Sequence, residues 1–416
     1  MILPKYSMGI GDRFAHQGKA QLAAFLKAKS LGVTVAPVWN KSNREHLIVH
    51  STPASVRVEA DAAVSALAWR DAYFVDADHI NLKTVDNFLA SSDFYTVDVA
   101  DYINKPAADA DIRVFVSSYR RYAGSLRIPG LSSDATLSPE HIEAIARKYL
   151  IAAEEAGRIY RHIESAKGKD NFITEVSMDE TDQPQTPMEL FFILAALADQ
   201  KVPLQTIAPK FTGRFNKGID YVGDRSQFEK EFNDDLAVIA FAVKEFALPK
   251  NLKLSIHSGS DKFSIYSLVR RALRTHNAGM HLKTAGTTWL EELIGLAMAG
   301  GEGLAIAKDV YRGTLARFDE VCTPYATVID IDRAKLPSPD EVAHWTGEHF
   351  AHVLRHDSSC PHYNRHVRQL LHVGYKLAAE MGSRYTDALE AYESAIAGNV
   401  TTNIFDRHLR PVFLDA

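Results

Sequence analysis

The chain alternates between short β-branched or aromatic runs and longer segments whose apolar residues recur every three or four positions. The short runs predict strands, and the longer periodic segments predict helices. The predicted strands are residues 33–39, 73–77, 94–99, 171–176, 204–208, 252–257, 279–283 and 327–330. The predicted helices are residues 19–31, 140–164, 187–198, 227–246, 263–276 and 288–299.

This alternation, with short connections in the second half, predicts parallel strands joined by helical crossovers. The pattern suits an α/β fold of the (β/α)₈ type, a TIM-like barrel, and 416 residues leave room for additions. We expect the barrel to occupy residues 1–335 and a helical C-terminal extension, residues 336–416, to pack on it. The alternative is a doubly wound sheet, which usually carries a glycine-rich phosphate turn after its first strand. Gly9-Ile-Gly11 and Gly300-Gly-Glu-Gly303 do not complete that fingerprint, which disfavours a nicotinamide cofactor.

Composition excludes several classes of function. The formal net charge is -5 and no block of Lys and Arg is present, so nucleic acid is not an expected partner. Two cysteines, Cys322 and Cys360, cannot build a disulfide framework, which favours a reducing cytoplasmic compartment. The N-terminal residues lack the plan of a signal peptide, and no apolar run approaches the ~20 residues of a membrane span. We therefore expect no membrane association.

Two segments place a histidine at the end of a predicted strand, with a lysine and small residues nearby. They are Ser255-Ile-His-Ser-Gly-Ser-Asp-Lys-Phe-Ser264 and His281-Leu-Lys-Thr-Ala-Gly-Thr287. In a barrel, such strand ends deliver side chains into the active site. His257 and His281 are therefore candidate ligands of one divalent cation, and His79 would complete a three-ligand site with an open position. Ligand type does not choose among Zn, Mn, Co, Ni and Fe. For either histidine alone, a satisfied core residue is the competing interpretation.

Acidic residues follow two other predicted strands. Asp78 stands beside His79, and a carboxylate next to an imidazole suits a base beside a metal ligand. The competing interpretation makes Asp78 a helix cap. Glu175 directly follows an apolar run and could reach the barrel axis. Asp179 and Glu180 precede a plausible helix start and are interpreted as capping residues.

Cations and a possible anion-binding loop complete the candidate site. Lys210 follows the strand at 204–208 and would suit an anionic substrate, although a solvated basic loop is the alternative. Residues Ser258 to Lys262 could present backbone amides to an anion, or Ser260 could simply cap the next helix. The histidines of the C-terminal part are interpreted as solvated helix faces and interface contacts.

Three segments together resemble the tagaturonate epimerase family: the two histidine segments, the second of them continued to Glu291, and Asn403-Ile-Phe-Asp-Arg-His-Leu-Arg-Pro411. The resemblance runs from Gly9-Ile-Gly-Asp-Arg13 to the end of the chain. It implies a divalent-metal-dependent interconversion of D-tagaturonate and D-fructuronate, and some relatives act on tagatose and fructose. It also implies that His79, His257 and His281 bind the metal. Trp289 stands where a Tyr-like aromatic is expected, which bears on the sugar accepted.

The implied reaction inverts C4 of a 2-keto sugar acid. The C4 hydroxyl is β to the ketone, so retro-aldol cleavage of C3–C4 is available, and a divalent cation can stabilise the enediolate. We expect Asp78 and Glu175 to form the acid/base pair, with Asp78 taking the C4 hydroxyl proton and Glu175 or Lys210 returning it.

Expected substrate contacts come from Lys210, Ser258, Asp261, Lys262 and Lys283, with one of the lysines binding the carboxylate. A metal-dependent aldolase, a keto-sugar isomerase or a tagatose/fructose 4-epimerase on the same barrel are the enzymatic alternatives. A sugar-acid binding protein without turnover is the non-enzymatic one. Whether the chain forms a homo-oligomer stays open.

Overall fold

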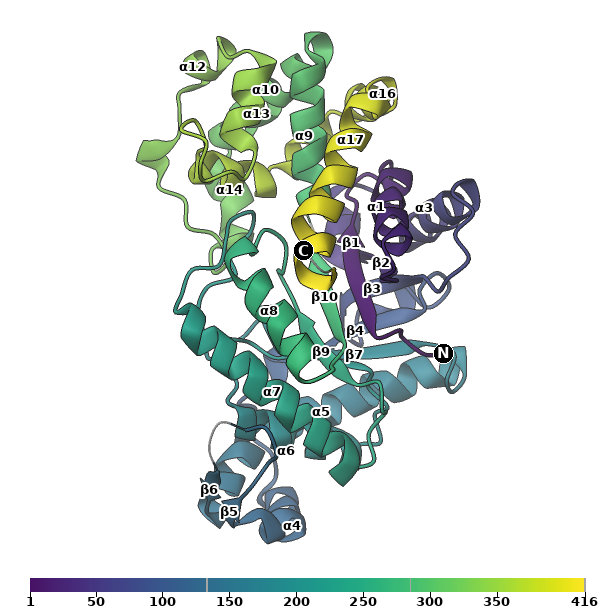
Figure 1. Cartoon of the computed structure of the whole chain (residues 1–416), viewed down its shortest axis with the longest axis vertical. Helices are drawn as coiled ribbons and strands as arrows, with labels where there is room; N and C mark the ends of the chain where they lie inside the picture. The colour runs from purple at the N-terminus through teal and green to yellow at the C-terminus, as the bar shows by residue number, and fades with distance from the viewer. Residues whose placement is uncertain (132–133, 285, 415–416) are drawn as a thin grey trace.

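Eight parallel strands form a closed barrel in the computed structural model, which describes residues 1–131, 134–284 and 286–414 (Figure 1). Around the barrel the strands follow the order β1-β10-β9-β8-β7-β4-β3-β2. Their bounds are β1 Tyr6–Gly11, β2 Ala36–Ser42, β3 Phe74–Ile80, β4 Phe94–Asp98, β7 Ile173–Ser177, β8 Thr206–Ala208, β9 Lys253–Ile256 and β10 Met280–Thr284. The predicted TIM-like α/β barrel is confirmed.

Helices cover the outside of the barrel. They are α1 Gly18–Ser30, α2 Asn43–Ile48, α3 Pro53–Ala66, α4 Asp109–Tyr119, α5 Pro139–Lys167, α6 Pro187–Asp199, α7 Arg225–Glu245 and α8 Phe263–Thr275. A small antiparallel hairpin, β5 Gly124–Leu126 and β6 Ala135–Leu137, stands beside α4 at one end of the molecule (Figure 1). The helices predicted from periodicity are all present: α1, α5, α7 and α8 each bury one side, whereas α6 and α9 are buried nearly all round.

The predicted strand at 327–330 is wrong, and the barrel is instead completed by β1. Two glycines make residues 6–11 a weak strand by propensity. Packing inside the barrel explains why residue 9 is glycine. A Cβ on Gly9 would lie 2.6 Å from the side-chain nitrogen Nδ2 of Asn40 and 3.0 Å from Cγ of Lys283. The missing side chain therefore makes room for the lysine that crosses the barrel interior. Residues 327–330 instead form an irregular segment, and the Val328 carbonyl accepts the Lys217 amide at 2.8 Å.

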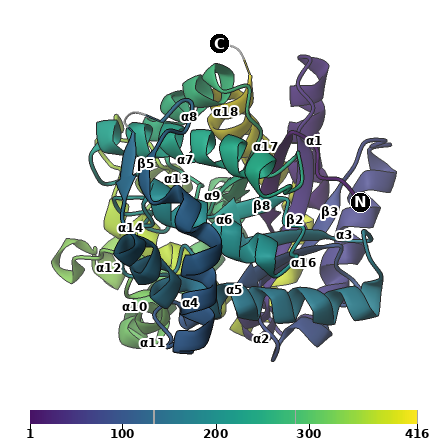
Figure 2. The same cartoon turned by 90° about the horizontal axis from the view of Figure 1, so that it is seen from below.

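In the described part of the chain, only helices and irregular segments follow β10. The helices are α9 Thr287–Ala299, α10 Gly301–Ala316, α11 Phe318–Cys322, α12 Pro339–Ala343, α13 Gly347–Leu354, α14 Arg365–Val373, α15 Tyr375–Glu380, α16 Ser383–Ala391, α17 Glu393–Ile404 and α18 Arg410–Phe413, with a π-helical turn at Phe405–Leu409. Most stand together beyond one end of the barrel, and α17 returns toward α1 (Figures 1 and 2). A helical C-terminal region is thus confirmed, while the boundary at residue 335 stays a prediction.

The segments that carry the family resemblance hold this helical region on the barrel. Asn403 accepts a hydrogen bond from Thr287 at 3.0 Å and donates one to Glu291 at 2.8 Å. His408 accepts the backbone amide of Asp261 at 3.0 Å. Since parallel strands all end on one side, the region also approaches the barrel mouth, where sites form in this fold. Among the described residues, no helix is long and apolar enough to cross a membrane.

Candidate active site

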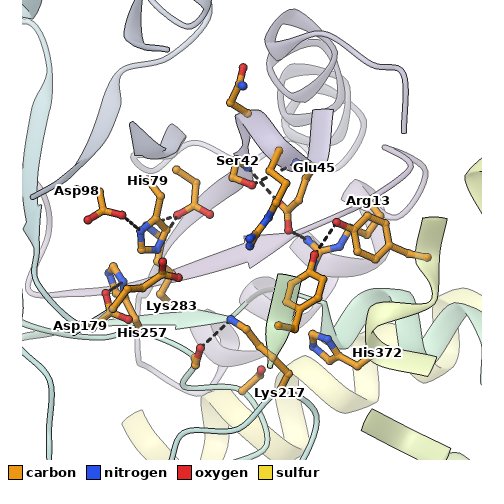
Figure 3. Close-up of a pocket in the computed structure, with 18 of the residues that line it drawn as sticks. Arg13, Ser42, Glu45, His79, Asp98, Asp179, Lys217, His257, Lys283 and His372 are labelled. Carbon is orange, nitrogen blue, oxygen red and sulfur yellow. Dashed lines mark hydrogen bonds and ion pairs between the residues drawn. The ribbon is translucent and has the colours of Figure 1, made fainter. Parts of the chain in front are cut away.

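A cavity of about 310 Å³ opens at the C-terminal ends of the barrel strands. Its size falls in the range of small-molecule sites. Each of the eight barrel strands contributes a lining residue near or beyond its C-terminal end: Arg13, Ser42, Asp78, Asp98, Asp179, Lys217, His257 and Lys283. The helical region adds Tyr325, His372 and Tyr375. Many of these side chains converge on the cavity in Figure 3.

The end of β3 presents two neighbouring side chains to the cavity. Regular strand geometry would send Asp78 and His79 to opposite faces. The pairing of β3 with β4 shifts register between Ala77 and Ile80, and His79 has a left-handed φ of 50°. Such an irregularity re-aims side chains, so both residues line the cavity. Nδ1 of His79 lies 3.0 Å from Oδ2 of Asp98, which fixes the ring.

A second histidine reaches the cavity from the end of β9. Nε2 of His257 lies 2.7 Å from Oε1 of Glu175, and Nδ1 lies 2.9 Å from Oδ1 of Asp179. Asp179 is available because Thr186, and not Asp179, caps α6. Burial lowers the pKa of His257, but the carboxylates of Asp179 and Glu175 outweigh it and raise that pKa to about 9.

The two imidazoles meet edge to face, with ring centroids 5.1 Å apart. Ligand atoms of His79, Asp179 and His257 lie within 4.8 Å of one another, and the same holds for His79, Asp98 and Glu180. Each histidine also has a carboxylate on one nitrogen, Asp98 for His79 and Glu175 for His257. Carboxylates commonly orient metal-binding imidazoles in this way. This arrangement has the donors and the support that a divalent cation needs.

His281 lies elsewhere. It pairs in register with Ser7 and Ser255, in the middle of the barrel wall, whereas His257 follows the end of β9. A separation of two strand residues corresponds to roughly 6.6 Å along the barrel axis. Its side chain is fully buried, Nδ1 lies 2.9 Å from Oγ of Ser7, and burial lowers its pKa to about 3. The structure therefore does not bring His281 into the cluster formed by His79, His257 and Asp179.

Lys283, two residues after His281, occupies the corresponding place at the mouth. Its ammonium lies 2.7 Å from Asp78, 2.8 Å from Asp76 and 3.3 Å from Glu175. Burial disfavours its charge, but the three carboxylates raise the pKa of Lys283 well above its usual value. Burial raises the pKa of Asp76 to about 7 although Lys283 opposes the rise. With its charge already surrounded, Lys283 is poorly placed to bind a substrate carboxylate.

Glu175 lies below the cavity floor rather than in its lining. It is fully buried, and Oε1 contacts both His257 and Lys283. Burial would raise the pKa of Glu175, but Lys283 and His257 outweigh it and hold the pKa well below its usual value. The charged Glu175 thus orients His257, and the acid/base role predicted for it stays a prediction.

The remaining predicted substrate contacts separate into two groups. Ser258 lines the cavity and accepts a hydrogen bond from Nζ of Lys217 at 2.9 Å. Lys210 lines a neighbouring cavity and donates to the Thr181 carbonyl. Asp261 and Lys262 are buried and do not line the cavity. Asp261 pairs with Arg368 at 3.0 Å, and the Lys262 ammonium donates to the backbone carbonyls of Asn216, Ile219 and Ser260. Asp261 and Lys262 therefore hold loops together.

One further sequence expectation concerns Trp289 in the second histidine segment. Trp289 is buried in the core, where its Nε1 donates to the Leu371 carbonyl at 2.7 Å, and it is not among the described lining residues of the cavity. Ala285 of that segment lies outside the described residues.

Sequence reasoning did not single out several residues of the cavity, among them Arg13, Asp98, Lys217 and His372. Asp98 ends a predicted strand, so its place carried a signal. Lys217 lies nine residues beyond β8, and His372 comes from α14. No local pattern connects those two with the barrel mouth.

A closed (β/α)₈ barrel with histidines, carboxylates and lysines converging at its C-terminal mouth defines the class of barrel enzymes that act on small molecules. The model of the tagaturonate epimerase family matches residues 2–394. The chain therefore belongs to the tagaturonate epimerase family, a family of isomerases.

Similar proteins agree with that membership. The chain is 28% identical over 422 residues to the tagaturonate/fructuronate epimerase of Thermotoga maritima, covering 97% of this chain and 80% of that protein. Among solved structures it is similar to fructuronate-tagaturonate epimerase from Cohnella laeviribosi. The native form has a TM-score of 0.78 at 23% identity, covering 98% of this chain and 81% of the other. A form complexed with two glycerol molecules gives 0.82 at 23% identity, covering 100% and 83%.

Proposed function

We propose that this protein interconverts D-tagaturonate and D-fructuronate, inverting C4 of the sugar acid in the cavity at the barrel mouth. Membership of the tagaturonate epimerase family supports the reaction. The observation that carries the proposal is the cluster of His79, His257 and Asp179 directly beside Asp78.

A divalent cation belongs in that cluster. His79, His257 and Asp179 would hold it, because imidazole and carboxylate are ligands of Zn, Mn, Co, Ni and Fe. The cation would polarise the substrate ketone as a Lewis acid. Asp98 and Glu175 support the two histidines from behind. In this proposal Asp179 takes the third position that the sequence assigned to His281.

Asp78 serves as the base. Burial would raise the pKa of Asp78, but Lys283 and His79 outweigh it and hold that pKa well below its usual value. The carboxylate is therefore ionised at neutral pH and can accept the proton of the C4 hydroxyl. Its place in the cavity lining and its contact with Lys283 keep it directed at the bound sugar.

Cleavage of C3–C4 then gives two three-carbon fragments. The electrons of the broken bond pass to C3 and the ketone, so the C1–C3 fragment becomes an enediolate. The C4–C6 fragment is an aldehyde that carries the carboxylate. The aldehyde rotates, C3 attacks its opposite face, and the proton returns to the C4 oxygen. Lys283 keeps Asp78 ionised before the proton is taken, since its ammonium contacts that carboxylate, and Asp78 gives the proton back to the C4 oxygen.

Removal and return of metal tests the proposal. Protein treated with a chelator should lose the conversion of D-tagaturonate to D-fructuronate, and added Zn²⁺, Mn²⁺, Co²⁺, Ni²⁺ or Fe²⁺ should restore it. His257→Ala should stay inactive after metal is returned. His352→Ala, a matched change at a histidine outside the cavity lining, should behave like the wild type. Full activity in chelated protein would refute the metal-dependent part.

Exchange of a labelled fragment tests the bond that breaks. A labelled C4–C6 aldehyde acid added during turnover should appear in product if C3–C4 opens. Net accumulation of both fragments would instead favour the aldolase alternative.

A further inference from the structure

The cavity wall that lies away from the histidine cluster is positively charged. Figure 3 shows Arg13 and His372 on one side and His79, Asp98, Asp179 and His257 on the other, while Lys217 reaches into the space between them from below. Arg13 and Lys217 come from the segments that follow β1 and β8, and His372 comes from α14. The helical region therefore completes a site that begins in the barrel.

Lys217 supplies a cation that no acid neutralises. Its Nζ donates to Oγ of Ser258 at 2.9 Å, and within residues 1–131, 134–284 and 286–414 no ion pair joins it to a carboxylate. Its own amide donates to the Val328 carbonyl at 2.8 Å, which fixes the loop. An ammonium that has room for further acceptors in a cavity favours an anionic ligand.

Arg13 supplies a second, buried cation. The residue is 5% exposed, its guanidinium pairs with Glu45, and that guanidinium stacks 4.8 Å from the centre of the Tyr375 ring. Its Nε has no hydrogen-bond partner among the described residues. The pair with Glu45 and the stacked ring hold the planar guanidinium in place, and an unused donor remains.

His372 stands between these cations with an unused nitrogen. It is 3% exposed, and its Nε2 has no hydrogen-bond partner in the described structure. Burial, and then the charges of Arg13 and Lys217, hold the pKa of His372 well below its usual value, so the ring is neutral. Glycines permit its approach: a Cβ on Gly286 would lie 2.6 Å from Nε2. A buried polar atom left without a partner is costly unless a ligand supplies one.

We propose that Arg13, Lys217 and His372 bind the carboxylate of the sugar acid and so select a uronate over a neutral ketose. This inference rests on the proposed function. The ketone and the carboxylate stand toward opposite ends of the six-carbon substrate, as the two walls of the cavity do. Acids near the histidine cluster, Asp78, Asp98 and Asp179, would repel a carboxylate from that end.

The anchor has a consequence for the chemistry. After C3–C4 opens, the carboxylate belongs to the aldehyde fragment that must rotate without leaving. A clamp on the carboxylate retains that fragment while the bond between C4 and C5 turns. Binding of the carboxylate thus favours epimerisation over aldol cleavage, because a fragment that is no longer held can leave the cavity.

Lys217→Met tests the inference, with Lys308→Met as the control at a lysine that lines neither this cavity nor the neighbouring one and donates to the Ala343 carbonyl. We measure kcat/KM for D-tagaturonate and for D-tagatose, which carries a hydroxyl where the uronate carries its carboxylate. The Lys217 variant should shift the ratio of the two values by about 10- to 100-fold toward D-tagatose, as expected for loss of a charged hydrogen bond. It should also release more aldehyde fragment per turnover. The Lys308 variant should change neither the ratio nor the amount of released fragment.

Calorimetric binding of the two sugars separates the possible failures. If the wild type does not convert D-tagaturonate, the proposed function fails, and the binding ratio still decides the subsite. If the wild type converts D-tagaturonate but Lys217→Met weakens the binding of both sugars equally, the proposed carboxylate subsite is wrong and the proposed epimerase function is unaffected. His372→Ala should shift the binding ratio in the same direction as Lys217→Met, and an unchanged ratio in both variants would overturn the inference.

Discussion

Replacing Lys283 by methionine should abolish activity by changing the protonation of the base. The ammonium lies within 2.7–3.3 Å of Asp76, Asp78 and Glu175, all buried. Removing the cation leaves these carboxylates without compensation, which in buried sites costs about 3–5 kcal/mol of folding free energy. Protonation of a carboxylate relieves part of that cost, so the pKa of Asp78 rises.

The sign of the pH effect follows. Asp78 must be ionised to accept a proton, so the acidic limb of the kcat/KM profile should move to higher pH in Lys283→Met. Below the raised pKa of Asp78, activity should fall by about 10²–10⁴-fold, the contribution of a positioned base. The assay is conversion of D-tagaturonate between pH 5 and 10, combined with urea unfolding.

Lys253 provides the matched control. Like Lys283 it is a buried lysine on a barrel strand, here β9. Its ammonium donates to backbone carbonyls of the N-terminal segment and does not line the cavity. Lys253→Met should destabilise the protein without moving the pH profile. If Lys283→Met kept the wild-type profile, Lys283 would not be the group that keeps Asp78 ionised, and the reasoning would be refuted.

Three further outcomes are expected. First, the pKa of His257 is raised to about 9 from 6.5, so its stabilising contribution, on the order of 3 kcal/mol, is complete below pH 6.5 and disappears as pH rises through 9. The melting temperature of chelated protein should fall over that pH interval while metal affinity rises, because metal displaces the proton. A melting temperature that does not change with pH would contradict this. Second, isothermal titration should show that His281→Ala keeps metal affinity within about threefold and Asp179→Ala loses at least about tenfold. The reverse order would restore His281 as a ligand. Third, Gly9→Ala should lower the free energy of unfolding in urea by about 1–3 kcal/mol, since its Cβ would contact Asn40 and Lys283. An unchanged free energy of unfolding would show that these side chains can move aside without cost.

Most of the barrel could be predicted from local patterns, because periodicity and strand length are properties of short segments. β1 escaped because its two glycines lower strand propensity, and the reason for Gly9 is a lysine 274 residues away in the chain. The segment at 327–330 looked like a strand because it is β-branched. Val328 and Ile329 instead pack in the core beside the neighbouring cavity that Lys210 lines, where tertiary contacts override propensity.

The site was predictable where function follows a strand end directly. Asp78, His79 and His257 all line the cavity as expected. The depth of a residue along its strand was not predictable, since it depends on register with neighbours, and this separates His281 from Lys283. Asp179 was interpreted as a cap because its loop precedes α6, whereas the capping box uses Thr186.

The cationic wall needed the full three-dimensional structure. Its members come from three distant parts of the chain, and His372 belongs to a histidine-rich segment interpreted as solvated surface. Charge and burial identify the wall only after the helical region is placed over the barrel mouth.

Location of a bound cation tests the central claim most directly. Crystals of the protein soaked in Mn²⁺ or Zn²⁺ can be measured at the metal's absorption edge, so that anomalous scattering marks the ion. The account predicts one strong peak between His79, His257 and Asp179, with bonds of about 2.0–2.2 Å for zinc. A peak at His281 deep in the barrel, or no peak at the mouth in fully active protein, would contradict it.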